Sequence, residues 1–223
     1  MKILIVEPHP DDAVLSCYGY LDKMKEDNDI SILNMSSVDG RNSLKFCEYM
    51  GINCLDISPD VSDVNFKKFR IPISEIKSHP KPYIYQMSKY SDIAPDIIDS
   101  CFHKIYGVLE SIKPDIVVGP LGIYHPFHVL TRIGFDAAVG KYKDAKVLLY
   151  ADKPYSNKQY GLFIIDNALN TDVDAYDLYE LTKETVRLKL KIFRKCYPTE
   201  SIHWDEPGMY QNPEVLFIPI NKE

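Results

Sequence analysis

The chain has 223 residues, which is enough for one domain with a sizeable core but not for two full domains. Hydrophobic residues make up 45% and charged residues 26%, so a disordered chain and a small disulfide-stapled scaffold are excluded. The formal net charge is −6 and no cluster of lysine and arginine occurs, which argues against nucleic acid or an anionic membrane surface as a partner.

The cysteines indicate a reducing compartment. There are five, an odd number, and none lies in a C-x-x-C pair, so they are typical of buried thiols in a cytoplasmic protein. The N-terminal apolar run is too short for a signal peptide, and no run approaches the roughly 18 apolar residues of a membrane span. We therefore expect a cytoplasmic protein with no membrane span.

Apolar runs alternate with helical periodicity in the first quarter of the chain. The pattern predicts strands at 2–6, 30–35 and 53–57, with helices at 13–26 and 42–50 between them. This alternation is typical of a parallel sheet with crossover helices.

The segment 58–92 interrupts this order. It contains several prolines and aromatic residues without a clear period, and it is too long for a plain connection. We interpret it as an insertion that borders a site and contributes to the substrate rim.

Regular patterns resume after this insertion. They predict helices at 94–112, 127–140 and 174–196 and strands at 116–121, 146–151, 161–165 and 215–220. We therefore expect one α/β domain over 1–223, with a Rossmann-like, mostly parallel sheet flanked by helices, an insertion and a C-terminal extension. In such a sheet the ligand site lies outside the carboxyl ends of the strands.

Two segments rich in titratable side chains follow predicted strands at that edge. Pro8-His9-Pro10-Asp11-Asp12 comes directly after the first strand, and His125-Pro126-Phe127-His128 comes after strand 116–121. Histidine and aspartate together supply a tripodal nitrogen and oxygen site that leaves one position open for water, as catalytic zinc requires. The two segments therefore predict a metal site.

A plainer explanation exists for each segment taken alone. Asp11 and Asp12 also suit the cap and first turn of a helix, and His125 and His128 also suit a polar loop. Capping predicts no histidine at either place, so the occurrence of both segments at equivalent strand ends favours the metal site.

Four segments resemble one enzyme family. The first segment, continued through Ala13-Val14-Leu15-Ser16-Cys17, is similar to the (A/P)-H-P-D-D-E motif of the PIG-L/LmbE-like zinc N-deacetylases, which remove acetyl from N-acetylglucosamine conjugates. The residues Gly119 to His128 resemble the family's G-x-H-x-D-H segment, Tyr150 to Tyr155 its Y-x-[DE]-x-P-Y segment, and Tyr197 to Glu200 its Y-P-S-Q segment. The four occur in family order over most of the chain.

The resemblance implies a role for each matching residue. His9, Asp12 and His128 would hold zinc, Asp11 would be the general base, and His125 would share the developing oxyanion with the metal. Iron(II) or cobalt suits the same ligand types. The implied fold is LmbE-like, and the implied partner is a small N-acetyl sugar conjugate.

Two positions depart from the family pattern. Ala13 replaces the usual Glu, and Phe127 replaces the Asp between the two histidines. In the family pattern that Asp would orient or charge the first histidine. A protein that keeps the fold and binds carbohydrate without turnover is therefore an alternative. A metal-dependent amidase acting on a non-sugar acyl amide is another.

Three residues are further candidates for substrate contacts. Arg41 follows the second strand and suits a phosphate or a sugar hydroxyl, although a surface arginine near a helix start is an equal explanation. Asp152 and Tyr155 follow strand 146–151 within the segment that matches the family.

Overall fold

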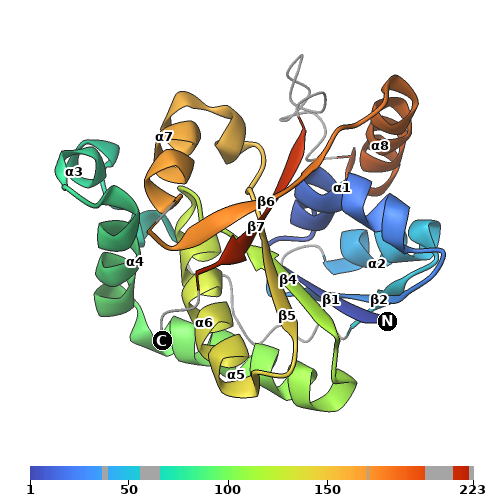
Figure 1. Ribbon diagram of the computed structural model, residues 1–223, viewed down its shortest axis with the longest axis horizontal. Helices are drawn as coiled ribbons and strands as arrows, with labels where there is room; N and C mark the ends of the chain where they lie inside the picture. The colour runs from blue at the N-terminus through green and yellow to red at the C-terminus, as the bar shows by residue number, and fades with distance from the viewer. Residues whose placement is uncertain (37–39, 56–65, 170, 199–212, 221–223) are drawn as a thin grey trace.

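The computed structural model describes residues 1–36, 40–55, 66–169, 171–198 and 213–220. Within these ranges seven strands form one sheet, in the order β3-β2-β1-β4-β5-β7-β6 (Figure 1). The strands are β1 (Lys2–Glu7), β2 (Asp29–Asn34), β3 (Asn53–Cys54), β4 (Ile116–Pro120), β5 (Lys146–Tyr150), β6 (Val173–Tyr179) and β7 (Glu214–Pro219). The helices are α1 (Asp12–Met24), α2 (Gly40–Met50), α3 (Ile73–Ser78), α4 (Pro82–Ile93), α5 (Pro95–Ile112), α6 (Pro126–Tyr142), α7 (Gln159–Ala168) and α8 (Lys183–Cys196), with 3-10 turns η1 (Phe66–Phe69) and η2 (Tyr155–Asn157).

The sheet is mostly parallel, as the sequence predicted. Strands β3, β2, β1, β4 and β5 run parallel, with Val6 of β1 opposite Leu33 of β2 and Ile5 opposite Val118 of β4. Strand β7 lies antiparallel between β5 and β6. The expected α/β class with a flanked, mostly parallel sheet is therefore confirmed.

Successive side chains of each central strand enter two different cores. Ile3 and Ile5 of β1 pack with residues of α1, α2 and α8, whereas Leu4 and Val6 pack with residues of α4, α5, α6 and α7. Figure 1 shows these two groups of helices on either side of the sheet. Because both faces are covered, the central strands are continuous apolar runs rather than alternating ones.

The helix predicted over 174–196 is wrong in its first part. Strand β6 occupies Val173–Tyr179 and α8 begins only at Lys183. Thr182 caps that helix, because its hydroxyl accepts a hydrogen bond from the backbone N–H of Thr185 at 3.1 Å. The segment before the cap pairs with β7 as a strand, although its sequence pattern continues that of the following helix.

The strand predicted over 161–165 is also wrong, since these residues belong to α7. Tyr160, Ile164 and Ala168 are buried at a spacing of four residues and face the core. A short apolar run does not by itself distinguish a buried strand from a buried helix.

The insertion is helical where the structure describes it, whereas residues 58–65 lie outside the described ranges. Pro72 directly precedes α3 and Pro82 is the first residue of α4, where the fixed φ of proline favours a helix start. Tyr83 and Tyr90 of α4 are buried against the core that α6 also lines. Pro72 and Pro82 therefore mark helix starts, whereas Pro80 lies in the bend between α3 and α4.

The sheet topology defines a ligand-binding edge. Strand β1 lies between β2 and β4, so the connection from β1 to β2 and the connection from β4 to β5 leave their common edge in opposite directions. Such a switch point opens a crevice at the carboxyl ends of the two strands. No helix in the described ranges is long and apolar enough to cross a membrane.

Candidate functional site

The loop after β1 is held from inside by a buried carboxylate. One oxygen of Glu7 accepts a hydrogen bond from the Ala13 backbone N–H at 3.1 Å, and the other accepts from the Ser43 hydroxyl at 2.6 Å. Burial raises the pKa of Glu7 well above its usual value, although both hydrogen bonds oppose that shift. Sequence reasoning missed Glu7, whose only signal is a charged residue at the end of an apolar strand.

Helix capping does not account for the two aspartates that follow. Asp11 occupies the cap position of α1, but its side chain makes no capping hydrogen bond. Asp12 is 2% exposed, and its Oδ2 accepts a hydrogen bond from the His9 backbone N–H at 2.8 Å. The Asp12 carboxylate is thereby turned back toward the loop that carries His9.

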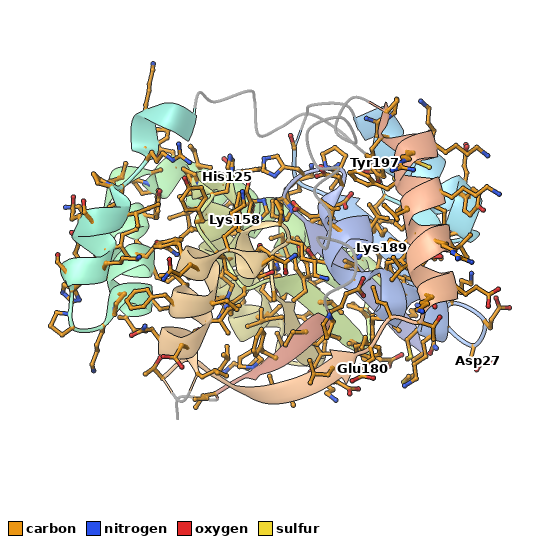
Figure 2. All side chains as sticks on the ribbon, turned by 90° about the horizontal axis from the view of Figure 1, so that it is seen from above. Asp27, His125, Lys158, Glu180, Lys189 and Tyr197 are labelled. Atoms are coloured by element: carbon orange, nitrogen blue, oxygen red, sulfur yellow. The ribbon has the colours of Figure 1, made fainter. Side chains whose placement is uncertain are left out.

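The loop after β4 brings the second histidine pair to the same place. Gly122 has φ +85° and Tyr124 has φ +66°, so the chain turns sharply before His125 and Pro126 begin α6. His128 then lies on the first turn of the helix and is buried. In Figure 2, His125 lies near the middle of the molecule, between the side that carries α3 and α4 and the side that carries α1.

Three side-chain atoms from the two loops form a small triangle. His9 Nδ1 lies 3.0 Å from His128 Nε2 and 3.4 Å from Asp12 Oδ2, and the remaining edge from His128 Nε2 to Asp12 Oδ2 measures 3.3 Å. A tetrahedral zinc site with ligands about 2.0–2.1 Å from the metal has ligand-to-ligand edges of about 3.3–3.4 Å. The triangle therefore has the dimensions of three ligands around one metal ion.

A wider group of three imidazoles is also compatible with a metal. His9, His125 and His128 each offer a ring nitrogen, and these atoms all lie within 4.8 Å of one another. The triangle that includes Asp12 is tighter and contains a carboxylate, which offsets the charge of a bound cation. We therefore take the Asp12 set as the better ligand set.

Asp152 supports the triangle from behind. Its Oδ1 lies 2.6 Å from His128 Nδ1, and its Oδ2 accepts from the backbone N–H groups of Gly122 and Ile123 at 2.9 and 3.1 Å. The side chain is fully buried, so Asp152 orients His128 and the β4–α6 loop. Asp152 is not among the residues that line the cavity over the cluster, so its contact with a substrate stays a prediction.

The charges of the site favour a cation at its centre. Burial alone would lower the pKa of His128, but Asp12 and Asp152 outweigh burial and raise it to about 9. Burial raises and His128 lowers the pKa of Asp12, with a net decrease. At His125, burial and then the positive charge of His128 and His9 lower the pKa to about 2, so this imidazole is neutral at neutral pH.

A cavity of about 230 Å³ opens over this cluster. Six of the predicted site residues line this cavity: His9, Asp11, Asp12, His125, His128 and Tyr155. Tyr155 forms one wall and stacks on His125, with ring centroids 6.1 Å apart and planes 22° apart. The side chain of Arg41 lies outside the described residues.

Sequence reasoning also missed Lys153, which lines the cavity and is 3% exposed. Burial, followed by the charge of Lys189, lowers the pKa of Lys153 to about 7. Lys189 of α8 extends its side chain toward α1 (Figure 2), where its amine donates to Leu15 O at 2.6 Å and contacts Glu214 at 2.7 Å. The only sequence signal for Lys153 is its place in the Tyr150 to Tyr155 segment.

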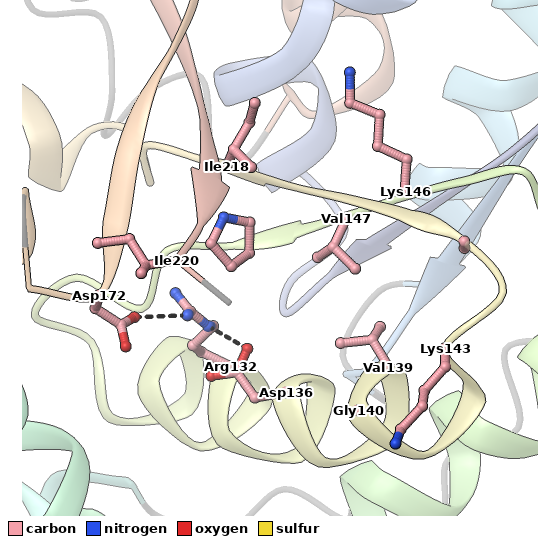
Figure 3. Close-up of a pocket in the computed structure, with 12 residues that line it drawn as sticks. Arg132, Asp136, Val139, Gly140, Lys143, Lys146, Val147, Asp172, Ile218 and Ile220 are labelled. Atoms are coloured by element: carbon pink, nitrogen blue, oxygen red, sulfur yellow. Dashed lines mark hydrogen bonds and ion pairs between the residues drawn. The ribbon is translucent and has the colours of Figure 1, made fainter. Parts of the chain in front are cut away.

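A larger cavity of about 750 Å³ lies elsewhere, at the beginning of β5 and the end of β7 (Figure 3). Arg132 borders it and is held by Asp136 at 2.7 Å and Asp172 at 2.8 Å. None of the predicted site residues lines this cavity. Because it opens at the amino end of a parallel strand, it is not at the edge where the chemistry-bearing loops converge.

Comparisons with known proteins identify the fold. No family model and no curated protein matches the sequence. Among solved structures, a deacetylase of teicoplanin biosynthesis matches with TM-score 0.72 and 15% identity over 100% of this chain and 99% of the other. A zinc-inhibited form of teicoplanin deacetylase matches with TM-score 0.69 and 14% identity over the same shares.

A third structure extends this group. The N,N'-diacetylchitobiose deacetylase of Pyrococcus horikoshii, bound to its inhibitor, matches with TM-score 0.54 and 15% identity over 98% of this chain and 84% of the other. At these identities the likeness establishes a shared fold. These three structural neighbours are named as deacetylases, the kind of enzyme that the motif resemblance implied.

Proposed function

We propose that the protein is a metal-dependent hydrolase that removes the acetyl group from an N-acetylated amino sugar or its conjugate. The observation that carries this proposal is the triangle of His9, Asp12 and His128, with edges of 3.0–3.4 Å, beside the carboxylate of Asp11 in one cavity. The names of the structural neighbours, which are deacetylases of teicoplanin and diacetylchitobiose, support this class of reaction.

His9, Asp12 and His128 would hold the metal, which we take to be zinc, with iron(II) or cobalt as substitutes of similar ligand preference. A bound zinc ion lowers the pKa of a coordinated water to about 7 and polarises the acetyl carbonyl. Asp152 accepts the Nδ1 proton of His128, so that the Nε2 lone pair faces the centre of the triangle. The buried carboxylates that favour a proton on His128 favour a metal cation at the same place.

Asp11 and His125 would carry out the proton and hydrogen-bond chemistry. The Asp11 carboxylate lines the cavity and takes the proton of the attacking water, and then delivers it to the nitrogen of the leaving amine. His125 is neutral and donates its ring N–H to the carbonyl oxygen as negative charge develops there. This role does not require a charged imidazole.

Tyr155 and the size of the cavity limit what the site encloses. About 230 Å³ is below the roughly 300–1,000 Å³ of typical small-molecule pockets, so the cavity suits the acetamido end of a ligand whose remainder crosses the rim. Tyr155 lines the cavity and would place an aromatic side chain beside the sugar.

The first test is elemental analysis of the purified protein beside two variants. We expect about one metal ion per chain in the wild type and in His103→Ala, an exposed histidine of α5, and loss of the metal in His128→Ala with the circular dichroism spectrum retained. The wild type without metal, even after reconstitution, would contradict the proposal.

The second test is acetate release from a panel of N-acetyl sugars and non-sugar N-acetyl amides. We expect turnover on the sugars, and a decrease of about 10²–10⁴-fold in Asp11→Asn, which keeps its metal. Asp22→Asn, which alters a surface ion pair with Lys25 on α1, is the matched control and keeps full turnover. Turnover of the non-sugar amides alone would instead support a general acyl amidase.

A further inference from the structure

One arginine contacts the aromatic residues next to the cavity, and among the described residues it has no acidic partner. Arg70 follows η1 and is exposed, and its guanidinium donates a hydrogen bond to the Tyr124 hydroxyl while it lies 4.8 Å from the centre of the same ring. In the described ranges no carboxylate forms an ion pair with it. Among the described residues its charge is therefore available to a ligand.

Tyr124 connects this arginine to the wall of the cavity. Its ring contacts that of Tyr155 with centroids 5.4 Å apart, and Tyr155 in turn lines the cavity and stacks on His125. A third ring, that of Tyr160, contacts Tyr124 edge-on, also at 5.4 Å. The guanidinium is thus fixed one aromatic ring away from the cavity lining.

The backbone of Tyr124 is unusual in a way that serves this placement. Its φ of +66° lies in the left-handed region, which a residue with a bulky side chain rarely adopts. The residue directly precedes His125, so the same turn that delivers His125 to the cavity also places the Tyr124 ring against that of Tyr155. Strain of this kind is typical of sites where the surrounding structure holds a side chain for a purpose.

The chemistry of Arg70 matches one class of ligand. A guanidinium presents its N–H donors in a planar fork that suits carboxylate and phosphate, and one already held by a tyrosine loses less freedom when it binds.

We propose that Arg70 and Tyr124 form a subsite for an acidic group, a carboxylate or a phosphate, carried by the acetamido sugar whose acetyl group lies in the cavity. This inference rests on the proposed function, because it assumes that the acetamido group is bound at the His9, Asp12 and His128 cluster. The preferred substrate is then an N-acetyl sugar with an anionic substituent, and a neutral glycoside binds more weakly.

The test compares three glycosides of N-acetylglucosamine in the metal-loaded enzyme: the neutral methyl glycoside, the carboxymethyl glycoside and the 1-phosphate. We expect a lower KM for an acidic glycoside, and an increase of that KM by about 10- to 100-fold in Arg70→Gln with little change in kcat. The KM of Arg70→Gln for the methyl glycoside stays within about twofold of the wild-type value, and added salt weakens the binding of only the acidic glycosides. A preference for one of the two acidic glycosides identifies which group the subsite takes.

Two variants serve as controls. Arg187→Gln removes an exposed arginine of α8, away from the cavity, and leaves every KM unchanged. Arg70→Lys keeps the charge but loses the fork, so its KM for the acidic glycosides lies between those of the wild type and Arg70→Gln. Equal KM values for acidic and neutral glycosides in the wild type, unchanged in Arg70→Gln, would overturn the subsite while leaving the proposed function intact.

Calorimetric binding to Asp11→Asn separates the two proposals. If the acidic glycosides bind this variant tightly and Arg70→Gln abolishes the preference, the subsite stands even when the wild type releases no acetate, and the proposed function fails. If acetate is released but binding of the acidic glycosides does not depend on Arg70, the proposed function stands and the subsite fails.

Discussion

Replacing Asp152 with asparagine tests how the structure prepares His128 to bind a metal. The carboxylate serves three donors, with one oxygen facing His128 Nδ1 at 2.6 Å and the other facing the backbone N–H groups of Gly122 and Ile123. Asparagine has the same shape but only one acceptor oxygen. It can satisfy the histidine or the two backbone groups, but not all three.

The energies decide between these two arrangements. Leaving both backbone N–H groups without an acceptor costs roughly 2–6 kcal/mol, at about 1–3 kcal/mol for each buried donor. We therefore expect the amide oxygen to stay on Gly122 and Ile123 and the amide NH₂ to face His128. Nδ1 must then accept, the proton moves to Nε2, and the lone pair that faces Asp12 and His9 is lost.

We expect the metal affinity of Asp152→Asn to fall by about 10- to 100-fold, as measured by competition with a chromophoric chelator. Circular dichroism would show the fold retained. Asp136→Asn is the matched control, because this aspartate of α6 pairs with Arg132 far from the triangle, and its metal affinity stays at the wild-type value. Equal affinity in Asp152→Asn and wild type would refute the tautomer argument.

Three further predictions concern stability. Burial lowers the pKa of Lys153 to about 7 against 10.5 in the unfolded chain, so the free energy of unfolding rises with pH across that interval, by at most about 5 kcal/mol. Urea titrations of Lys153→Met should show a smaller change of this free energy with pH, and an equally large change would contradict the assignment. Gly119→Ala should lower the melting temperature and reduce the free energy of unfolding by about 1–3 kcal/mol, because the new Cβ would lie 2.6 Å from the ring of Phe135. In the control Gly107→Ala the new Cβ meets nothing within 4 Å, so this change should be neutral or stabilising. Equal melting temperatures of the two variants would argue against the contact with Phe135. Phe127→Asp buries a carboxylate at a position that is 1% exposed, so calorimetry should show a less stable protein. Its rate of acetate release should not rise, and a large rise would instead support the turnover-deficient alternative.

The central strands and the two site loops could be predicted because their signals are local. β1 and β4 are apolar runs buried on both faces, and each is followed within a few residues by the titratable side chains that the fold brings together. Since parallel strands share a carboxyl edge, the order of the segments along the chain was sufficient to predict that His9 and His128 meet.

The two wrong secondary-structure predictions arose where a local sequence pattern is compatible with both a strand and a helix. The run at 161–165 suits a buried strand or a buried helix, and packing of Ile164 into the core beneath α7 decided for the helix. The segment at 173–179 followed a helical period, but pairing with β7 made it a strand. In both cases the partner surface, not the segment, selected the structure.

The amino-acid sequence by itself determined the α/β class, the edge of the sheet where the candidate site lies, and the residues His9, Asp11, Asp12, His125 and His128 that line one cavity there. Only the tertiary structure decided which of them approach within 3.0–3.4 Å, that Asp152 stands behind His128, and that Arg70 contacts Tyr124. The physical reason is that these contacts join residues far apart in the chain, and the packing of α6 and the insertion against the sheet sets their distances, on which no local pattern reports.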